Sequence, residues 1–462
     1  MNDEDLAFVP ISVVAQMLRS GATTSSALTE IMLARIAKFE PALNAYITVT
    51  AELARAQAAR ADAELKVGDD RGPLHGIPIA IKDLIATKGV RTTSGTLYYK
   101  DWVPDHDATV VRKLADAGAV CLGKTGLHEL AYGSTSNNPH YGAIINPWKA
   151  GYHPGGSSGG SAVAVAAGLA YAALGTDTGC SVRMPAHCCG IVGHKPTFGL
   201  VSTVGVVPLV ASLDHVGPMT RSVRDAALLL AAIGGPDPDD PVSAMREVGD
   251  PAARFGEGLE GVRLGVPRGW FYQGGATEVV ALVDAAVEYL RDLGAAVVEV
   301  ELSDPKAAYH ATAVMFAEVA VALGEKIAEN PDGFSDNVRQ TNERNGRVSA
   351  ADYIKALAVR RAFCREVDTV MADIDALVTP TSTVAAAPIA EQPADHVRER
   401  WKNAGLFNFT GQPSISIPCG LTEAGLPVGM MITGRRFEDD RVLQIADAYE
   451  QATDWHGLRP PL

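Results

Sequence analysis

A glycine-dense segment near the middle of the chain constrains the fold more than any other feature. Residues 151–199 contain 11 of the 45 glycines of this 462-residue chain. Two glycine-rich loops, PGGSSGGS (154–161) and GTDTGCSVRMP (175–185), enclose the apolar run Ala162–Leu174. A membrane span needs about 20 apolar residues, so this shorter run predicts a buried core helix. Glycine-rich loops allow close backbone approach, and we therefore expect a packed core that presents two backbone-lined loops.

Strand and helix patterns alternate along the chain. Residues 76–82 (GIPIAIK) place three isoleucines on one face, as in a strand, and Lys82 ends the pattern. A helical pattern near Thr109–Ala117 leads to a short strand pattern at Ala119–Leu122. This alternation predicts an α/β fold. Further helical patterns occur at Ile11–Arg19, Ser26–Phe39, Ala51–Leu65, Val223–Ile233, Glu278–Leu293 and Arg441–Gln451.

The charge balance and the cysteines narrow the class of protein. The chain has 40 Lys and Arg against 54 Asp and Glu, a formal net charge of −14, whereas a protein that follows nucleic-acid phosphates carries a basic surface. We therefore expect a small-molecule substrate or a protein partner, and no nucleic acid. The N-terminus lacks the features of a secretory signal, and six cysteines without a CxxC pair fit a reducing compartment. These observations predict a cytoplasmic protein that has no membrane segment, and they leave its oligomeric state open.

Three short patterns suggest other chemistries. GAVCLGKT (118–125) matches the phosphate loop GxxxxGK[ST], but its interior is itself an apolar strand, whose N–H groups are committed to a sheet. His128 begins an HExxH motif in which Tyr132 replaces the second ligand, so we expect no metal. GGSSG (155–159) matches the GxSxG nucleophile elbow, which also requires an acid and a histidine later in the chain. That alternative stays open.

Lys82 and the two glycine-rich loops fit one kind of chemistry. Burial at the end of an apolar strand disfavours the charged form of a lysine and lowers its pKa, so the amine can act as a base near neutral pH. The exposed backbone N–H groups of a glycine-rich loop can stabilise an oxyanion. A snorkelling or ion-paired lysine and an ordinary glycine-rich turn are the structural alternatives.

Five longer motifs, in order along nearly the whole chain, resemble those of the amidase signature family of serine hydrolases. They are KDLIATKGVRTTSGT from Lys82, PGGSSGGSAVAVAAG from Pro154, GTDTGCSVRMPAHCCGIVGHKPTFG from Gly175, SLDHVGP from Ser212 and NFTGQPSISIPCGLTEAGLPVG from Asn408. Agreement of several long motifs in order is far more specific than any short pattern.

The resemblance implies a catalytic triad and a mechanism. The family's base falls on Lys82, its bridging serine, which follows a cis peptide bond, on Ser157, and its nucleophile on Ser181. Lys82 would take a proton through Ser157 while Ser181 attacks the carbonyl carbon, and water would then hydrolyse the acyl-enzyme. No metal and no organic cofactor is implied.

The resemblance also assigns the oxyanion hole. Its donors would be the backbone N–H groups of Thr178, Gly179, Cys180 and Ser181. The family usually has glycine where this chain has Cys180, and a positive φ there would strain a cysteine by about 1 kcal/mol or more. Cys180 is also a rival nucleophile. Tyr132 falls in the family's acyl pocket, although a buried core tyrosine is the structural alternative.

The fold implied is a single amidase domain over residues 1–462, with a large mixed, twisted β-sheet flanked by many helices. Within it we expect a signature core that holds the triad, a variable substrate-side region and a C-terminal return to the core, at residues 1–233, 234–405 and 406–462. The Pro- and Asp-rich segment Gly234–Pro241 is the predicted linker. Loops within Asn330–Ser349 and Thr379–Trp401 are expected to determine substrate specificity.

The resemblance leaves two functions to distinguish. We expect a hydrolase that cleaves the carbon–nitrogen bond of a small-molecule amide, anilide or carbamate, as an aryl acylamidase or a urethanase does. The alternative is the A subunit of a tRNA-dependent amidotransferase, a glutaminase that works in a complex with protein partners. No motif in the variable region decides between the two.

Overall fold

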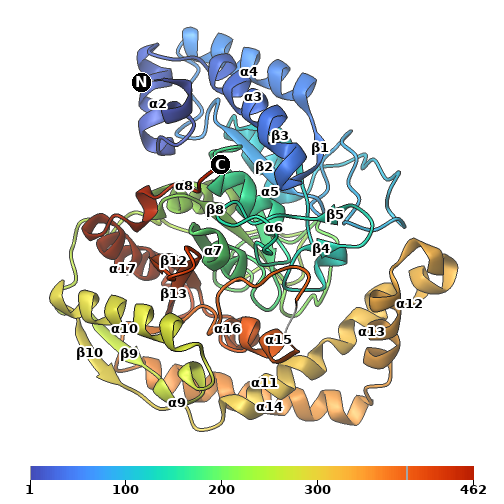
Figure 1. Ribbon diagram of the computed structural model, residues 1–462, viewed down its shortest axis with the longest axis vertical. Helices are drawn as coiled ribbons and strands as arrows, with labels where there is room; N and C mark the ends of the chain where they lie inside the picture. Colours follow the sequence, from blue (N-terminus) through green and yellow to red (C-terminus); the bar gives the residue numbers. More distant parts are fainter. Residues whose placement is uncertain (1, 392–393) are drawn as a thin grey trace.

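The computed structural model describes residues 2–391 and 394–462, and most of its strands form one mixed β-sheet (Figure 1). Among these residues, 11 strands join the sheet in the order β1-β3-β2-β6-β8-β7-β12-β13-β11-β9-β10, and β4 and β5 form a separate pair. The strands are β1 Tyr46–Val49, β2 Pro78–Lys82, β3 Val120–Thr125, β4 Asn137–Asn138, β5 Gly142–Ala143, β6 Ala172–Asp177, β7 Val192–Lys195, β8 His215–Thr220, β9 Arg263–Val266, β10 Ala296–Glu299, β11 Ala376–Pro380, β12 Ser414–Leu421 and β13 Pro427–Gly434.

The strand directions place two strand ends at one edge of the sheet. β2 pairs in parallel with both β3 and β6, whereas β6 pairs with β8 in antiparallel fashion. Because parallel strands run in the same direction, Lys82 at the end of β2 and Asp177 at the end of β6 lie at the same edge of the sheet. The sheet thus brings Lys82 next to the loop that follows β6.

Helices cover both faces of this sheet, since β2, β3, β6, β8 and β13 are buried along their whole length. The helices are α1 Asp3–Leu6, α2 Ile11–Ser20, α3 Ser25–Leu43, α4 Ala51–Lys66, α5 Thr109–Asp116, α6 Gly159–Ala166, α7 Arg183–Cys189, α8 Val223–Ile233, α9 Arg268–Tyr272, α10 Thr277–Asp292, α11 Pro305–Met315, α12 Ala317–Glu329, α13 Asp336–Gly346, α14 Ala350–Met371, α15 Ala394–Trp401, α16 Ala404–Thr410 and α17 Asp439–Ala452, with the 3-10 turns η1 Glu129–Ala131, η2 Pro331–Gly333 and η3 Trp455–Gly457. The expected α/β fold with a large mixed sheet is confirmed.

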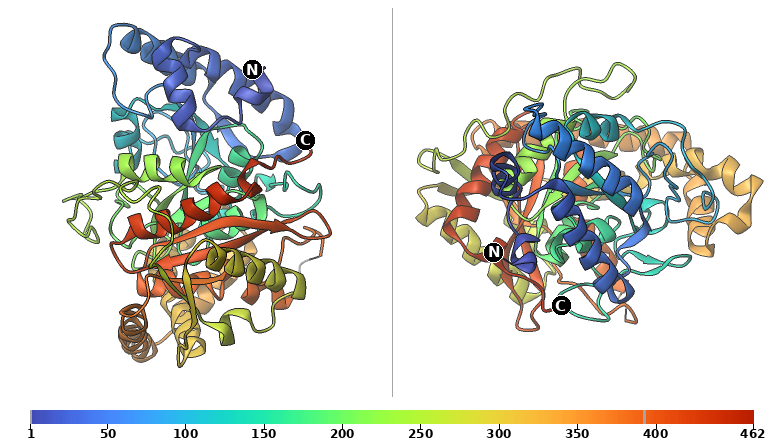
Figure 2. Two further views of the ribbon diagram at one scale, coloured as in Figure 1. Left: turned by 90° about the vertical axis from the view of Figure 1, so that its left-hand side faces the viewer. Right: turned by 90° about the horizontal axis from the view of Figure 1, so that it is seen from above.

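The two ends of the chain lie near each other (Figure 2). Arg459 forms an ion pair with Asp5 at 3.2 Å there. The expected division into a core, a variable region and a return segment stays a prediction. Residues 234–262, which include the predicted linker, contain neither helix nor strand apart from an isolated bridge at Gly234.

The apolar run Ala162–Leu174 is buried throughout, but it is not the single helix that we predicted. α6 ends at Ala166, Gly168 takes a φ of +63°, and the chain enters β6 at Ala172. Glycine adopts this left-handed conformation without the steric cost of a side chain, which ends the helix. The run therefore supplies a short helix and a central strand.

The segment Asn330–Ser349, predicted as a loop, is mostly helical. α13 occupies Asp336–Gly346, and the side chain of Ser335 caps it by accepting a hydrogen bond from the backbone N–H of Val338. Together α11 to α14 form the bottom and the lower right of the molecule in the view of Figure 1. This helical region approaches the strand ends that carry Lys82 and Asp177, because α11 and α13 line the pocket described below.

One stretch of the described residues, Pro305–Glu329, has the length and composition of a membrane-crossing helix. Its most apolar window has a mean hydropathy of 1.4, and 33% of that window is buried. The stretch consists of α11 and α12, joined at Phe316. Phe316 stacks on Tyr132 of the signature core, so this stretch packs against the body of the protein.

Candidate active site

Lys82 is fully buried at the end of β2, where three hydroxyl groups surround its amine. Its Nζ donates to Ser157 Oγ at 2.7 Å, to Ser158 Oγ at 2.8 Å and to Thr176 Oγ1 at 2.8 Å. Burial lowers the pKa of Lys82 from 10.5 to about 7, although the negative charge of Asp177 opposes this change. The amine is thus close to half neutral at pH 7, and the neutral form is the one that can accept a proton.

The hydroxyl contacts show which serine has a free proton to give. Ser158 Oγ accepts from the backbone N–H of Thr176 at 3.2 Å and donates to the Thr176 carbonyl at 3.2 Å, so its own proton is committed. Among the contacts of the described residues, Lys82 is the only partner of Ser157 Oγ. A neutral Lys82 can therefore donate to Ser158 and Thr176 while its lone pair faces Ser157. Our sequence interpretation missed Ser158 and Thr176.

The structure brings Ser157 and Ser181 onto adjoining turns. The peptide bond between Gly156 and Ser157 is cis, and the backbone N–H of Ser158 donates to the carbonyl oxygen of Ser181 at 3.2 Å. Ser157 is fully buried, whereas Ser181 is 7% exposed and lines a pocket. The three residues expected to form the triad, Lys82 among them, therefore gather at one edge of the sheet.

Residues 178–181, which we call the oxyanion loop, connect β6 to the turn before α7. Within the described part of the chain, the backbone N–H groups of Gly179, Cys180 and Ser181 donate to no other protein group. All four loop residues line the pocket. The hydroxyl of Thr178 donates to the carboxylate of Asp214 at 2.5 Å, which anchors the start of the loop. Unpaired N–H groups beside a nucleophile are the arrangement that stabilises a developing oxyanion.

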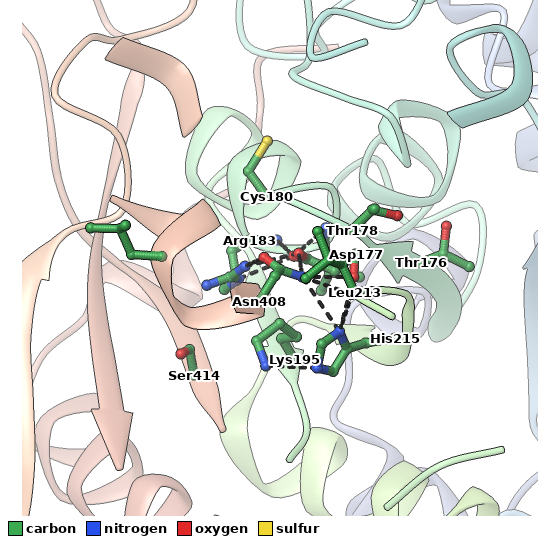
Figure 3. A network of polar contacts seen from close by, with 12 residues as sticks. Thr176, Asp177, Thr178, Cys180, Arg183, Lys195, Leu213, His215, Asn408 and Ser414 are labelled. Atoms are coloured by element: carbon green, nitrogen blue, oxygen red, sulfur yellow. Dashed lines mark hydrogen bonds and ion pairs between the residues drawn. The ribbon is translucent and has the colours of Figure 1, made fainter. Parts of the chain in front are cut away.

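Asp177 and Arg183 hold the two ends of the oxyanion loop together (Figure 3). Asp177 ends β6, and its carboxylate accepts from the backbone N–H of Val182 at 2.9 Å and from Arg183 Nη2 at 2.8 Å. Both charged side chains are fully buried. This ion pair and its hydrogen bonds keep the pKa of the Asp177 carboxyl below its ordinary value. This pairing makes the oxyanion loop a closed turn.

Cys180 occupies its place without backbone strain. It is not among the described non-glycine residues that have a positive φ. Its side chain is 4% exposed, and its Sγ lies 3.9 Å from the carbonyl oxygen of Gly156. Burial raises the pKa of the Cys180 thiol to about 12. The thiolate that a cysteine nucleophile requires is therefore scarce at neutral pH, which disfavours Cys180 as the nucleophile.

A pocket of about 420 Å³ opens above Ser181 and the oxyanion loop. Tyr132 lies in its wall, where its hydroxyl accepts from Asn345 Nδ2 at 2.9 Å and its ring stacks on Phe316 at a centroid distance of 5.6 Å. Trp401 at the end of α15 also lines the pocket. Arg344 from α13 supplies the one charged side chain among the described residues of the lining. The sequence named Tyr132 itself, but for Arg344 and Trp401 it marked only the segments that carry them.

Comparison with known proteins identifies the family. Residues 27–443 match the Amidase family. The chain belongs to this family of amidase signature hydrolases. A curated relative of this amidase from Roseiflexus sp. is 40% identical over 98% of each chain, and one from Moorella thermoacetica is 39% identical over 99% of each. A solved structure from Thermotoga maritima is 34% identical, with a TM-score of 0.85, over 100% of this chain and 98% of that one.

The names of these relatives correct two expectations. All three are named as the A subunit of glutamyl-tRNA(Gln) amidotransferase. The expectation that this amidase hydrolyses a small-molecule amide, anilide or carbamate is therefore wrong, and the relatives support the alternative function instead. The expectation that no nucleic acid is a partner is wrong for the same reason. Net charge averages over the surface of one chain, so it does not describe a complex that contains several different chains.

Proposed function

We propose that this amidase is the glutaminase subunit of a tRNA-dependent amidotransferase. It would release ammonia from the side-chain amide of glutamine and work in a complex with protein partners and tRNA. The observation that carries the proposal is the nearly full-length similarity to curated A subunits. The cytoplasmic location stays a prediction, in keeping with that role.

The charge of the pocket supports an anionic amide as the substrate. Arg344 faces the pocket, and no Asp or Glu is among the described residues that line it. A guanidinium group binds a carboxylate with two parallel hydrogen bonds. The carboxylate of glutamine could therefore bind Arg344 at the exposed rim, while its side-chain amide reaches Ser181. A neutral anilide or carbamate has no group for this arginine.

The first half of the reaction would transfer the glutamyl group to the enzyme. Neutral Lys82 takes the proton of Ser157, Ser157 takes that of Ser181, and Ser181 Oγ attacks the amide carbon. The free N–H groups of the oxyanion loop stabilise the negative charge on the amide oxygen. The protonated relay then returns its proton to the leaving nitrogen. The C–N bond breaks, and ammonia and a glutamyl ester of Ser181 result.

The second half would regenerate the enzyme. Water attacks the ester carbon and gives its proton through Ser157 to Lys82, and the same N–H groups stabilise the second oxyanion. Ser181 leaves as an alcohol and glutamate is released. The nucleophile, the relay and the oxyanion donors thus come from this chain, and the ammonia is available to a partner protein.

A glutaminase assay with and without partner proteins tests the proposal. We would express the tagged chain in its native host, isolate the complex, and measure glutamate and ammonia released from glutamine. The expected result is partner-dependent glutamine hydrolysis with equal amounts of both products, lost in Ser181→Ala and weakened in Arg344→Gln. Isolation of the chain without partners, together with no glutamine hydrolysis but rapid hydrolysis of neutral amides, would contradict it.

A further inference from the structure

Asn408 links α16 to the end of β6, directly beneath the oxyanion loop (Figure 3). Its Nδ2 donates to the backbone carbonyl of Asp177 at 2.8 Å and to the Asp177 carboxylate at 2.9 Å. Its Oδ1 accepts from Arg183 Nη2 at 2.6 Å. The side chain is fully buried. One amide group thus uses both its donor and its acceptor on the pair that closes the loop.

The position of Asp177 determines the position of the oxyanion donors. Its backbone enters the loop, and its carboxylate accepts from the N–H groups of Val182 and Arg183, at 2.9 and 3.3 Å, where the loop ends. The N–H groups of residues 179–181 lie between these two anchors. Displacement of the carboxylate would therefore displace the donors, which stabilise an oxyanion only when they point at it.

His215 lies next to Asn408, since both side chains contact the carbonyl groups of Leu213 and Asp177, and Lys195 lies behind His215. His215 Nδ1 lies 2.6 Å from the Leu213 carbonyl and 3.2 Å from the Asp177 carbonyl, so it carries the proton of the ring. His215 Nε2 is then an acceptor for Lys195 Nζ at 3.2 Å. Lys195 also donates to the Gln412 carbonyl at 2.6 Å. The polar groups of His215 and Lys195 thus already have partners.

We propose that Asn408 is a positioning residue for acyl transfer, which aligns the oxyanion donors by holding Asp177 and Arg183 together. The inference rests on the proposed role of Ser181 as the nucleophile, but not on the identity of the substrate. The amide group is essential to it. Aspartate at position 408 has nearly the same shape, but it cannot donate to the Asp177 carbonyl and it adds a negative charge beside that carboxylate. Alanine removes both contacts.

The test uses a fluorophosphonate probe, which phosphonylates a reactive serine and forms an oxyanion in the same hole. Its saturation kinetics separate the inactivation rate constant from the binding constant, and they require neither glutamine nor a partner. We would compare Asn408→Ala and Asn408→Asp with Asn403→Ala. Asn403 is a matched control, because it is a buried asparagine that borders the same helix and donates to two backbone carbonyls, of Phe271 at 2.8 Å and of Pro380 at 2.9 Å.

We expect the inactivation rate constant of both Asn408 variants to fall about 100-fold, the effect of a misplacement of about 1 Å in an active site. Their binding constants stay near the wild-type value, and Asn403→Ala keeps the wild-type rate. Rates are expressed per folded molecule, from circular dichroism and active-site titration. Asn408→Ser, which is smaller and polar, serves if the other variants do not fold. Equal rates in the Asn408 variants and Asn403→Ala would overturn the proposal.

The site that the probe labels tests separately whether Ser181 is the nucleophile. Peptide mapping by mass spectrometry locates the probe in the wild-type protein. A probe on a residue other than Ser181 would overturn both the triad and the role of Asn408. A probe on Ser181 whose rate does not depend on Asn408 would overturn only the positioning role. Labelled Ser181 with no glutamine hydrolysis in the complex would overturn the proposed substrate and leave this inference standing.

Discussion

The protonation of Lys82 makes the activity depend on pH in a way that the structure specifies. Burial lowers the pKa of this lysine from 10.5 to about 7. At about 1.36 kcal/mol for each pH unit, that difference corresponds to about 5 kcal/mol of bias against the charged amine. An ordinary lysine would be neutral in roughly 0.03% of molecules at pH 7. Buried Lys82 is neutral in about half of them, a gain of about a thousandfold in the active form.

We therefore expect kcat/KM to rise with pH along a limb of unit slope that is half-maximal near pH 7. At pH 6 it reaches about a tenth of its plateau value. Steady-state rates of ammonia release from glutamine by the assembled complex, between pH 5 and 9, measure this limb. Lys82→Arg keeps the charge but cannot deprotonate in this range, so its activity should be lost at every pH.

Lys124 provides the matched control for this experiment. It is also a fully buried lysine, whose pKa burial lowers to about 8, but its Nζ faces the carbonyl of Ile85 and the hydroxyls of Thr87 and Thr92. Lys124→Met should leave the limb near pH 7. A limb near pH 10 in the wild type, or a Lys82→Arg variant with wild-type activity, would refute the assignment of Lys82 as the base.

Four further outcomes follow from the geometry. Ser181→Ala should lower kcat for ammonia release by about 10⁴-fold or more. Cys180→Ala should stay active in the same assay, because the Cys180 thiol is protonated at neutral pH. The reverse pattern would make Cys180 the nucleophile. Arg344→Gln should raise the KM for glutamine by about 10-fold to 100-fold with little change in kcat, and an unchanged KM would remove this arginine from the site. Asp177→Asn should lower the free energy of unfolding by about 3–5 kcal/mol, because it leaves the buried charge of Arg183 without its carboxylate partner; urea denaturation measures this, and a wild-type midpoint would contradict it. Lys82→Met should be more stable than the wild type at pH 6, where the folded protein must keep a buried ammonium ion, and the difference should shrink as the pH rises from 7 towards 10.5; parallel stability curves for the two proteins would show that this lysine is not desolvated.

The strand that carries Lys82 was predictable because its signal is local. Alternating isoleucines identify β2, and the pattern also shows where it ends. The helix α13 was not predictable in the same way. Its residues DNVRQTNERNG are nearly all polar, so no apolar periodicity marks the helix. Arg344 was therefore invisible as a pocket residue, although the segment that carries it was expected to shape the substrate site.

The contacts around the triad also differ in how far the sequence could predict them. Ser158 and Thr176 lie one residue and two residues from predicted site positions, yet nothing in the sequence says which hydroxyl faces the amine of Lys82. Asn408 is further out of reach, since its partners Asp177 and Arg183 lie more than 200 positions away in the chain. Contacts of that separation exist only once the sheet has formed. Sequence motifs identified the family, and the fold was needed to show what holds the oxyanion loop.

The covalent intermediate offers the most direct test of the whole account. The complex would be mixed with glutamine, quenched in acid during turnover, digested, and mapped by mass spectrometry. We predict a γ-glutamyl group on the peptide that contains Ser181, located on Ser181 by fragmentation and absent from the Lys82→Arg protein. A glutamyl group on Cys180, or ammonia release with no acylated residue, would contradict the account.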